Sequence, residues 1–185
     1  MTQLILLDRD GVINIDPGYI AQPQHWQAIT GSLEAIAQLN QAGYTVVVAT
    51  NQSGIGRGKF SHADLAKVHE KMRADLRQVG GRVDQIFYCP HVPTEHCACR
   101  KPKIGLFEQI SQYYGKSLQG VPLIGDKLSD LQAAMNFGGR AILVRTGYGQ
   151  NTLELLRDPI YRHLQAHTQV VDDLAAAVHW LLQRP

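Results

Sequence analysis

The chain has 185 residues, of which 44% are hydrophobic and 18% charged, and its formal net charge is +2 at pH 7. The length favours a single domain over 1–185, the composition is that of an ordinary globular protein, and the small charge gives no reason to expect nucleic acid as a partner. The segment MTQLILLDRDG lacks the features of a signal peptide, and no apolar run approaches the ~20 residues of a membrane span. We therefore expect a cytoplasmic protein with no membrane partner, in a compartment where disulfides are rare.

Apolar runs of strand length alternate with segments of helical period along the chain. The strands are predicted, in chain order, at 4–7, 44–50, 85–89, 121–125, 141–144 and 169–171. The helices are predicted at 31–42, 61–76, 105–114, 129–137 and 174–181, the second of them opened by a capping box of Ser61 and Asp64. The segment 145–158 is expected to be a loop that can move. This alternation is typical of βαβ units and indicates an α/β fold with a parallel sheet.

In open parallel sheets ligands bind beyond the carboxyl ends of the strands. The first predicted strand is followed by Asp8 and Asp10, the second ends at Thr50, and the fourth is followed by Asp126 and Asp130. Crowded carboxylates repel one another, and a divalent cation such as Mg²⁺, which prefers oxygen ligands, removes that cost. A lone aspartate at a strand end is commonly a turn or cap residue. Two acidic motifs in this order, with a threonine between them and a lysine before the second, instead indicate a site.

The residue types at these strand ends suit phosphoryl transfer. A carboxylate beside Mg²⁺ can attack phosphorus, and an aspartate two residues further on can protonate the leaving oxygen. Thr50 and Lys101 can supply the positioning and the positive charge that this reaction needs. The glycine-rich SGIGRG at 53–58 is not a dinucleotide fingerprint, because it has the wrong spacing and follows the second strand. It favours a loop that approaches a phosphate or a sugar, with a plain flexible turn as the alternative.

Four pieces of the chain, DRDG, TN, RKP and GDKLSD, resemble the four motifs of the haloacid dehalogenase superfamily of phosphatases. The resemblance covers most of the chain and implies a three-layer α/β/α, Rossmann-like fold around a central parallel sheet. It implies that Asp8 is the nucleophile, forming an aspartyl-phosphate, and that Asp10 is the general acid and then the base. It also implies that Mg²⁺ is held by the carboxylates of Asp8 and Asp126 and the backbone carbonyl of Asp10. The transferring phosphoryl group would be bound by Thr50 and Lys101.

Within this superfamily the chain is similar to the branch without a cap domain, and the segments between its motifs are too short for a cap. That branch includes histidinol-phosphate phosphatases and D-glycero-D-manno-heptose-1,7-bisphosphate 7-phosphatases. Both families carry a zinc loop before the motif lysine, and CPHVPTEHCACRKP at 89–102 is similar to it. The resemblance therefore implies a structural Zn²⁺ in a loop at about 89–99, held by Cys89, His91, Cys97 and Cys99. His96 is a rival ligand, but it breaks the spacing.

The resemblance leaves two substrates open. The short zinc loop is more similar to the histidinol-phosphatase version, and Asp16 could pair with the cationic histidinol phosphate. The segments DPGYI, TNQSGIGRGKF, GDKLSDLQAA and VRTG are instead similar to the heptose enzymes, whose bisphosphate substrate needs a second anion-binding patch. We therefore favour removal of the heptose 7-phosphate, in ADP- or GDP-heptose synthesis for the lipopolysaccharide core. The residues expected to bind substrate are Asp16, Gly18, Tyr19, Asn51, Gln52, Ser53, Arg57, Arg100 and Lys127, with Arg145 as a further basic residue at a strand end.

Two other classes of function fit parts of the pattern. A non-catalytic zinc- and phosphate-binding module is disfavoured because every catalytic position carries a competent residue. A nucleic-acid 3′-phosphatase is disfavoured because the sequence shows no basic stripe with interleaved aromatic residues. We expect a monomer that acts on a small phosphorylated sugar. The histidines outside the zinc loop are expected to have no role in the site, and they include His62 and His69, which the periodicity assigns to a polar helix face.

Overall fold

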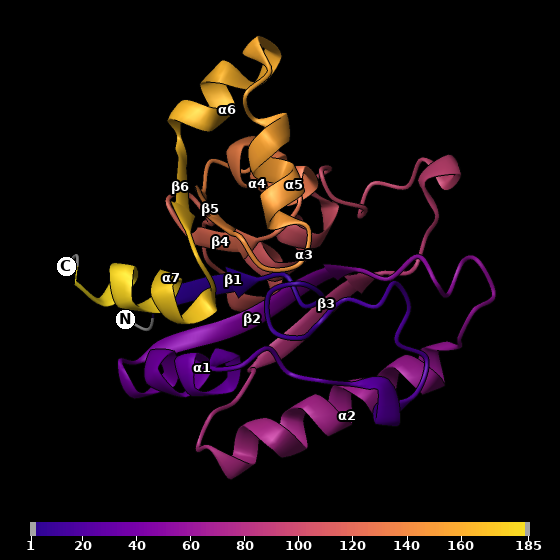
Figure 1. Cartoon of the computed structure of the whole chain (residues 1–185). Coiled ribbons are helices and arrows are strands. Elements are labelled where there is room, and N and C mark those ends of the chain that lie inside the picture. The colour runs from indigo at the N-terminus through magenta and orange to yellow at the C-terminus, as the bar shows by residue number, and fades with distance from the viewer. Residues whose placement is uncertain (1–2, 184–185) are drawn as a thin grey trace.

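The computed structural model describes residues 3–183. Six strands form one sheet in the order β3-β2-β1-β4-β5-β6 (Figure 1), and every neighbouring pair is parallel. The strands are β1 (Gln3–Leu7), β2 (Tyr44–Asn51), β3 (Gln85–Cys89), β4 (Pro122–Gly125), β5 (Arg140–Val144) and β6 (Thr168–Val171). The predicted α/β fold with a parallel sheet is therefore confirmed.

Helices cover both faces of this sheet and make it the middle of three layers (Figure 1). One face carries α1 (Ser32–Gln41), α2 (His62–Gln78) and α7 (Leu174–Leu182). The other face carries α3 (Gly105–Tyr114), α4 (Leu128–Asn136), α5 (Gly149–Leu155) and α6 (Arg162–Ala166). Short 3-10 helices lie in the connections, at η1 (Pro23–His25), η2 (Pro93–Glu95) and η3 (Pro159–Tyr161).

The side chains of β1 show how the sheet joins the two helical layers. Ile5 and Leu7 belong to the core that contains α1, α2 and α7, whereas Leu4 and Leu6 belong to the core on the other face. Because successive strand residues point to opposite faces, a strand covered on both faces must be apolar throughout. Each of these side chains stabilises the fold by about 1.5–3 kcal/mol when fully buried. The run LILL therefore fixes the strand that leads directly into the site.

Two local predictions have different outcomes. The capping box at the start of α2 is confirmed, because the Ser61 hydroxyl accepts the backbone N–H of Asp64 at 3.1 Å and the Asp64 carboxylate accepts that of Ser61 at 3.1 Å. The prediction that 145–158 is all loop is wrong, because α5 lies within it. This helix is fixed to the sheet through Thr152, whose hydroxyl donates to the backbone carbonyl of Asp126 at 2.7 Å.

The carboxyl ends of β1, β2 and β4 meet at one edge of the sheet. The strand order reverses there, since β1 has β2 on one side and β4 on the other. The connections that follow β1, β2 and β3 extend beyond this edge, on the right of Figure 1. The topology thus brings together residues that are far apart in the sequence.

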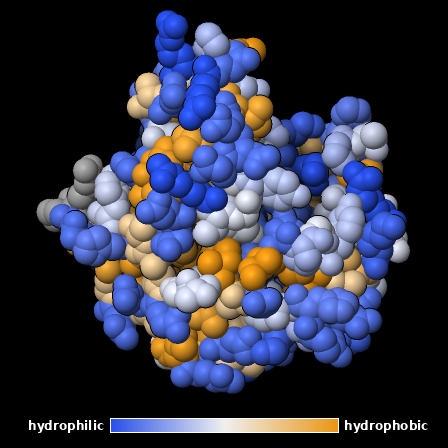
Figure 2. Space-filling model, in the orientation of Figure 1, coloured by the Kyte–Doolittle hydropathy of each residue, from blue (hydrophilic) through white to orange (hydrophobic). Residues whose placement is uncertain are grey.

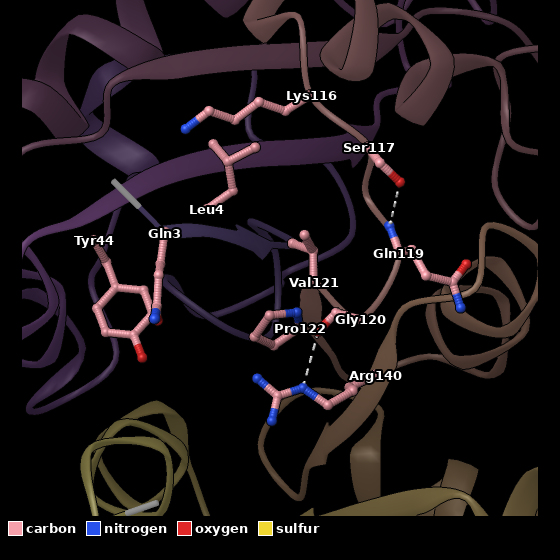
Figure 3. Close-up of a pocket in the computed structure, with 10 residues that line it drawn as sticks. All are labelled: Gln3, Leu4, Tyr44, Lys116, Ser117, Gln119, Gly120, Val121, Pro122 and Arg140. Carbon is pink, nitrogen blue, oxygen red and sulfur yellow. Dashed lines mark hydrogen bonds between the residues drawn. The ribbon is translucent and has the colours of Figure 1, made fainter. Parts of the chain in front are cut away.

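A separate cavity of about 580 Å³ lies at the opposite end of the strands (Figure 3). Its lining includes the first residues of four strands, Gln3, Tyr44, Pro122 and Arg140, and residues of the connection 116–121. Among its described lining residues there is no acidic, histidine or cysteine side chain. This cavity therefore lacks the groups that the predicted chemistry requires.

Figure 2 shows the hydropathy of one face of the molecule. On the face that Figure 2 shows, hydrophilic residues cover most of the surface and apolar residues form small separate groups. Between residues 3 and 183, no helix has the length and apolar character needed to cross a membrane.

Candidate active site

Three buried carboxylates gather at the carboxyl edge of the sheet. Asp8 follows β1, Asp126 follows β4, and Asp130 lies in the first turn of α4. One carboxylate oxygen of each lies within 4.8 Å of those of the other two. The Oδ1 atoms of all three are buried. Those of Asp8 and Asp130 pair with the ammonium group of Lys101, whereas Asp126 Oδ1 has no hydrogen-bond partner and its nearest described cation, Lys127, is 4.0 Å away. Buried polar atoms without partners are costly, so this cluster needs positive charge.

The chemistry of the cluster fits a hard divalent cation. Burial raises the pKa of Asp126 to about 8, and the charge of Asp8 adds to the rise. Gly11 has φ +84°, and a Cβ at this position would lie 2.1 Å from Oδ2 of Asp126. Only glycine therefore lets the chain after β1 pass this close to the carboxylate. Oxygen ligands that converge with open coordination positions are what Mg²⁺ prefers.

Lys101 is the cation that the chain itself places in the cluster. Its ammonium group lies 3.0 Å from Asp8 Oδ1, forms an ion pair with Asp130, and donates to the carbonyl of Ala49 at 2.7 Å. Burial alone lowers the pKa of this lysine, but Asp130 and Asp8 outweigh burial and raise it. Lys101 therefore stays charged beside the carboxylate that is the predicted nucleophile.

Asp10 lies beside the cluster and accepts hydrogen bonds from three side chains. Arg9 donates to both carboxylate oxygens, at 2.7 Å and 2.9 Å from Nη2, and Asn14 donates to Oδ1 at 2.9 Å. Gln52 donates from Nε2 to Asp10 at 2.8 Å and to the hydroxyl of Thr50 at 3.1 Å. Burial raises the pKa of Asp10, but the charge of Arg9 and these hydrogen bonds together lower it. Asp10 is therefore ionised in this state and held in one orientation.

A cavity of about 370 Å³ opens beside these groups. Its lining contains the predicted residues Asp10, Asp16, Gly18, Tyr19, Asn51, Gln52, Ser53, Arg100, Lys101 and Lys127. Lys127 pairs with Asp16 at 3.0 Å, and its ammonium group lies 4.8 Å from the centre of the Tyr148 ring. The mouth of this cavity is thus formed by the loop after β1, the start of α4 and the segment before α5.

Two predicted basic residues lie elsewhere. Arg57 is exposed on the loop 53–58 and is not among the lining residues of this cavity, so the structure does not bring it to the site. Arg145 pairs with Asp172 at 3.0 Å on the surface. Both positions follow a strand, but Arg57 lies on the exposed part of the glycine-rich loop, and Asp172, directly after β6, is the partner of Arg145.

The second cluster contains the predicted zinc ligands. The Sγ atom of Cys89 lies 3.6 Å from that of Cys97 and 3.1 Å from that of Cys99, and His91 Nδ1 lies 3.5 Å from Cys89 Sγ. In a tetrahedral zinc site the Zn–S bonds are about 2.3 Å, which puts neighbouring ligands roughly 3.8 Å apart. The donor set and its spacing therefore fit Zn²⁺, while His96 is exposed and stays outside the cluster.

Sequence reasoning missed several polar residues of the site. The sequence predicts His69 on a polar helix face, but it is 5% exposed and its Nε2 lies 3.1 Å from Nη1 of Arg9. Its spacing from Leu65 and Met72 is that of the apolar face of α2, and this signal could have corrected the prediction. Arg9 and Tyr148 had no comparable signal, because their positions depend on the packing of distant segments.

Comparisons with known proteins agree with this geometry. The family model HAD-hydrolase-like matches residues 98–177, and the family model Polynucleotide kinase 3 phosphatase matches residues 7–128. The D-glycero-beta-D-manno-heptose-1,7-bisphosphate 7-phosphatase of Bordetella bronchiseptica is 50% identical over 182 residues, which cover 98% of each chain. The enzyme of the same name from Pseudomonas putida is 46% identical over 181 residues, with 97% of this chain and 99% of the relative covered.

Solved structures point to the same family. The crystal structure of the D,D-heptose 1,7-bisphosphate phosphatase from B. bronchiseptica, complexed with magnesium and phosphate, has a TM-score of 0.92 and 49% identity and covers 100% of both chains. The phosphatase of the same description from Burkholderia thailandensis has a TM-score of 0.76 and 41% identity, with 99% of this chain and 100% of that chain covered. The relatives fit the heptose interpretation and not the histidinol alternative. The chain therefore belongs to the heptose-1,7-bisphosphate 7-phosphatase family of the haloacid dehalogenase-like hydrolases.

Proposed function

We propose that this protein is a Mg²⁺-dependent phosphatase that removes the 7-phosphate of D-glycero-D-manno-heptose 1,7-bisphosphate. The reaction would be a step of ADP- or GDP-heptose synthesis for the lipopolysaccharide core. The observation that carries the proposal is the buried group of Asp8, Asp126, Asp130 and Lys101 beside a cavity whose mouth holds further basic residues. A carboxylate cluster of this kind suits attack on phosphorus, and the basic mouth suits a substrate with a second phosphate.

The first step forms a covalent intermediate on Asp8. An oxygen of Asp8 attacks the phosphorus of the 7-phosphate, and the bond from phosphorus to the sugar oxygen breaks. Asp10, which takes up a proton from solvent when the anionic substrate binds beside it, gives that proton to the sugar oxygen. Bound Mg²⁺, for which Asp8, Asp126 and the backbone carbonyl of Asp10 are the proposed ligands, supplies positive charge that lowers the cost of bringing two anions together. Lys101, 3.0 Å from Asp8, adds charge on the protein side.

The second step releases phosphate and restores the enzyme. Asp10, now a carboxylate, takes a proton from a water molecule, and this water attacks the phosphorus of the aspartyl-phosphate. The bond from phosphorus to Asp8 breaks, so inorganic phosphate leaves and Asp8 is regenerated. The hydrogen bonds to Asp10 in the structure are those of its carboxylate form, which is the form that acts as the base.

Substrate recognition is assigned to the cavity lining and to Thr50, which is buried next to it and accepts a hydrogen bond from the lining residue Gln52. Thr50 and Lys101 bind the transferring phosphoryl group, while Arg100 and Lys127 bind the 1-phosphate. The segment from Asp16 to Tyr19 and the residues Asn51 to Ser53 contact the sugar. No contact supports the predicted role of Arg57, which lies outside the cavity lining.

The zinc cluster is assigned a structural role. All four of its proposed ligand positions are filled by side chains, which leaves no position for a reacting water. The loop also holds Arg100, whose Nη1 donates to the carbonyl of His91 at 3.2 Å. Bound Zn²⁺ would therefore fix the segment that delivers Arg100 and Lys101 to the site. We further propose that residues 1–185 form one domain and that the protein is cytoplasmic and monomeric. Size-exclusion chromatography with light scattering tests the monomeric state.

The test is phosphate release with Mg²⁺ from the α and β anomers of heptose 1,7-bisphosphate, with histidinol phosphate in parallel. We expect strong preference for one heptose anomer and almost no turnover by Asp8→Asn, which removes the nucleophile but keeps the size of the side chain. Preference for histidinol phosphate would overturn the substrate assignment. Full activity of Asp8→Asn would overturn the mechanism.

A further inference from the structure

Arg9 is a fully buried cation that the proposed reaction does not use. It lies between Asp8 and Asp10 in the sequence and is 0% exposed, the largest such side chain in the described core. A buried guanidinium group needs partners for its N–H donors, because an unpaired buried charge is very costly. The positions of the hydrogen-bond acceptors therefore determine where the guanidinium group of Arg9 can lie.

The guanidinium group hydrogen-bonds two side chains on opposite sides. Nε and Nη2 donate to the carboxylate of Asp10, the shortest of these bonds being 2.7 Å. Nη1 lies 3.1 Å from Nε2 of His69, which is 60 residues away on α2. Because Nη1 can only donate, Nε2 of His69 is the acceptor, and the proton of this histidine is on Nδ1.

The surroundings of His69 keep it neutral and in place. Burial lowers its pKa to about 3, and the positive charges of Arg9 and Arg73 contribute to the shift. Its ring packs edge-on against Tyr88 of β3, with 6.1 Å between the ring centres. A neutral imidazole held between a helix and the sheet is a fixed acceptor, whereas water in its place would let the guanidinium move.

We propose that His69 is a positioning residue for proton transfer by Asp10, acting through Arg9. His69 holds Nη1, so the other edge of the guanidinium faces Asp10 and fixes the direction of its carboxylate. Asn14 and Gln52 fix the same carboxylate from other sides, at 2.9 Å and 2.8 Å. The inference rests on the proposed function, because it concerns the proton that Asp10 gives to the sugar oxygen.

The matched variants are His69→Asn and His69→Gln. Both carry an amide, but only the longer glutamine side chain can place its oxygen where Nε2 lies. Without the acceptor, Arg9 can turn away from Asp10. The rate should then fall by part of the 10²- to 10⁴-fold that a general acid contributes. We therefore expect His69→Asn to lose roughly 10- to 100-fold in kcat/KM for the heptose bisphosphate, and His69→Gln to regain most of it.

A leaving-group comparison separates this role from a structural one. The parameter kcat/KM covers the steps up to formation of the aspartyl-phosphate, in which Asp10 protonates the sugar oxygen. The 4-nitrophenolate ion leaves without a proton, so kcat/KM for 4-nitrophenyl phosphate should fall only a few-fold in His69→Asn. His163→Asn, an exposed position on α6 whose ring packs against His167, is the control and should behave as wild type with both substrates.

Two results would overturn the inference. One is an equal loss for both substrates in His69→Asn, which would show general damage to the site. The other is wild-type activity of a folded His69→Asn. A wild-type protein that does not act on the heptose bisphosphate would instead contradict the proposed function. The kcat/KM of His69→Asn relative to wild type would then be measured with histidinol phosphate, whose leaving oxygen also needs a proton. Failure of the inference can therefore be told apart from failure of the proposed function.

Discussion

At the scale of single residues, the site depends on a lysine that is buried with two carboxylates. Lys101 is 3% exposed, and its partners Asp8 and Asp130 are 4% and 1% exposed. A buried ion pair contributes little compared with apolar packing, but removing one member leaves the other charge unpaired. The three residues therefore depend on one another for both charge balance and chemistry.

The Lys101→Met variant should lose both activity and stability. Removing one charge that stabilises the transferring group costs about 10²- to 10³-fold in kcat. The two carboxylates left unpaired should lower the free energy of unfolding by about 3–5 kcal/mol without Mg²⁺. Phosphate release and urea unfolding measure the two effects. Lys67→Met, which removes an exposed pair with Asp64, is the control and should change unfolding by less than about 1 kcal/mol.

His69 should make part of the stability dependent on pH. Its pKa is about 3 in the folded chain and 6.5 in its ordinary state, so the unfolded chain binds a proton first as the pH falls. The contribution is fully present above pH 6.5 and is lost as the pH falls towards 3. The loss is about 1.4 kcal/mol per pH unit, or roughly 2 kcal/mol between pH 6.5 and 5.

Urea unfolding of wild type and His69→Gln at pH 7, 6 and 5 tests this dependence. The glutamine variant has no group to titrate there, so the difference in free energy of unfolding between the two proteins should shrink as the pH falls. Both proteins keep the same zinc site, so any acid loss of zinc affects them equally. A difference that stays constant over this range would contradict a neutral buried histidine.

At the scale of elements, the spacing of apolar residues along the sequence is enough to predict most strands and helices. LILL and the segment VVVAT at 46–50 are buried on both faces, so their composition follows directly from their position in the sheet. The helix α5 could not be predicted with the same ease, because it is short and held by Thr152 and Tyr148, whose partners are on Asp126. Its stability comes from tertiary contacts that a local pattern does not contain.

The connection after β3 is the element that should depend on metal. It contains only the short helix η2, and its cysteine and histidine ligands lie at its two ends and next to Lys101. Removing Zn²⁺ with a chelator, or the His91→Ala change, should lower Tm by about 5–15 °C, since about 1 kcal/mol shifts Tm by roughly 2–4 °C at this size. KM should rise more than kcat falls, because Arg100 loses its support.

His96→Ala is the matched control for this prediction. His96 lies in the same loop but is exposed and outside the cluster, so this variant should keep zinc, Tm and KM. Metal content measured by atomic emission gives the direct comparison. Protein purified without chelator that contains no zinc, or equal behaviour of the two histidine variants, would contradict the assignment.

At the scale of the whole molecule, the sequence motifs could predict which residues meet but not what surrounds them. The alternation of strands and helices predicts a parallel sheet, whose carboxyl edge carries Asp8, Thr50 and Asp126, whereas the strand order that makes β1 the neighbour of β2 and β4 is known only from the structure. The contact between Arg9 and His69 needs the packing of α2 against the sheet, at side-chain detail that no motif encodes. The exclusion of Arg57 likewise depends on the path of a glycine-rich loop.

The two strands that meet at the reversal, β1 and β4, should be held together by Mg²⁺. Asp8 and Asp126 repel each other when no Mg²⁺ is bound, because Lys101 pairs with Asp8 and Asp130. A ligand that binds only the folded chain stabilises it by about 2.7 kcal/mol at one hundred times its Kd. At this chain length the gain corresponds to a rise in Tm of roughly 5–10 °C. Differential scanning calorimetry across a series of Mg²⁺ concentrations after EDTA treatment measures this rise.

Asp126→Asn decides whether the rise comes from this cluster. The amide lowers the repulsion with Asp8, so the metal-free variant should melt no lower than wild type, yet it should gain little from Mg²⁺. Asp172→Asn removes an equal charge on the surface, where Asp172 pairs with Arg145, and should keep the full rise. If Asp126→Asn kept the full rise as well, Mg²⁺ would stabilise the fold elsewhere, and the ligand set at the edge of the sheet would have to be reassigned.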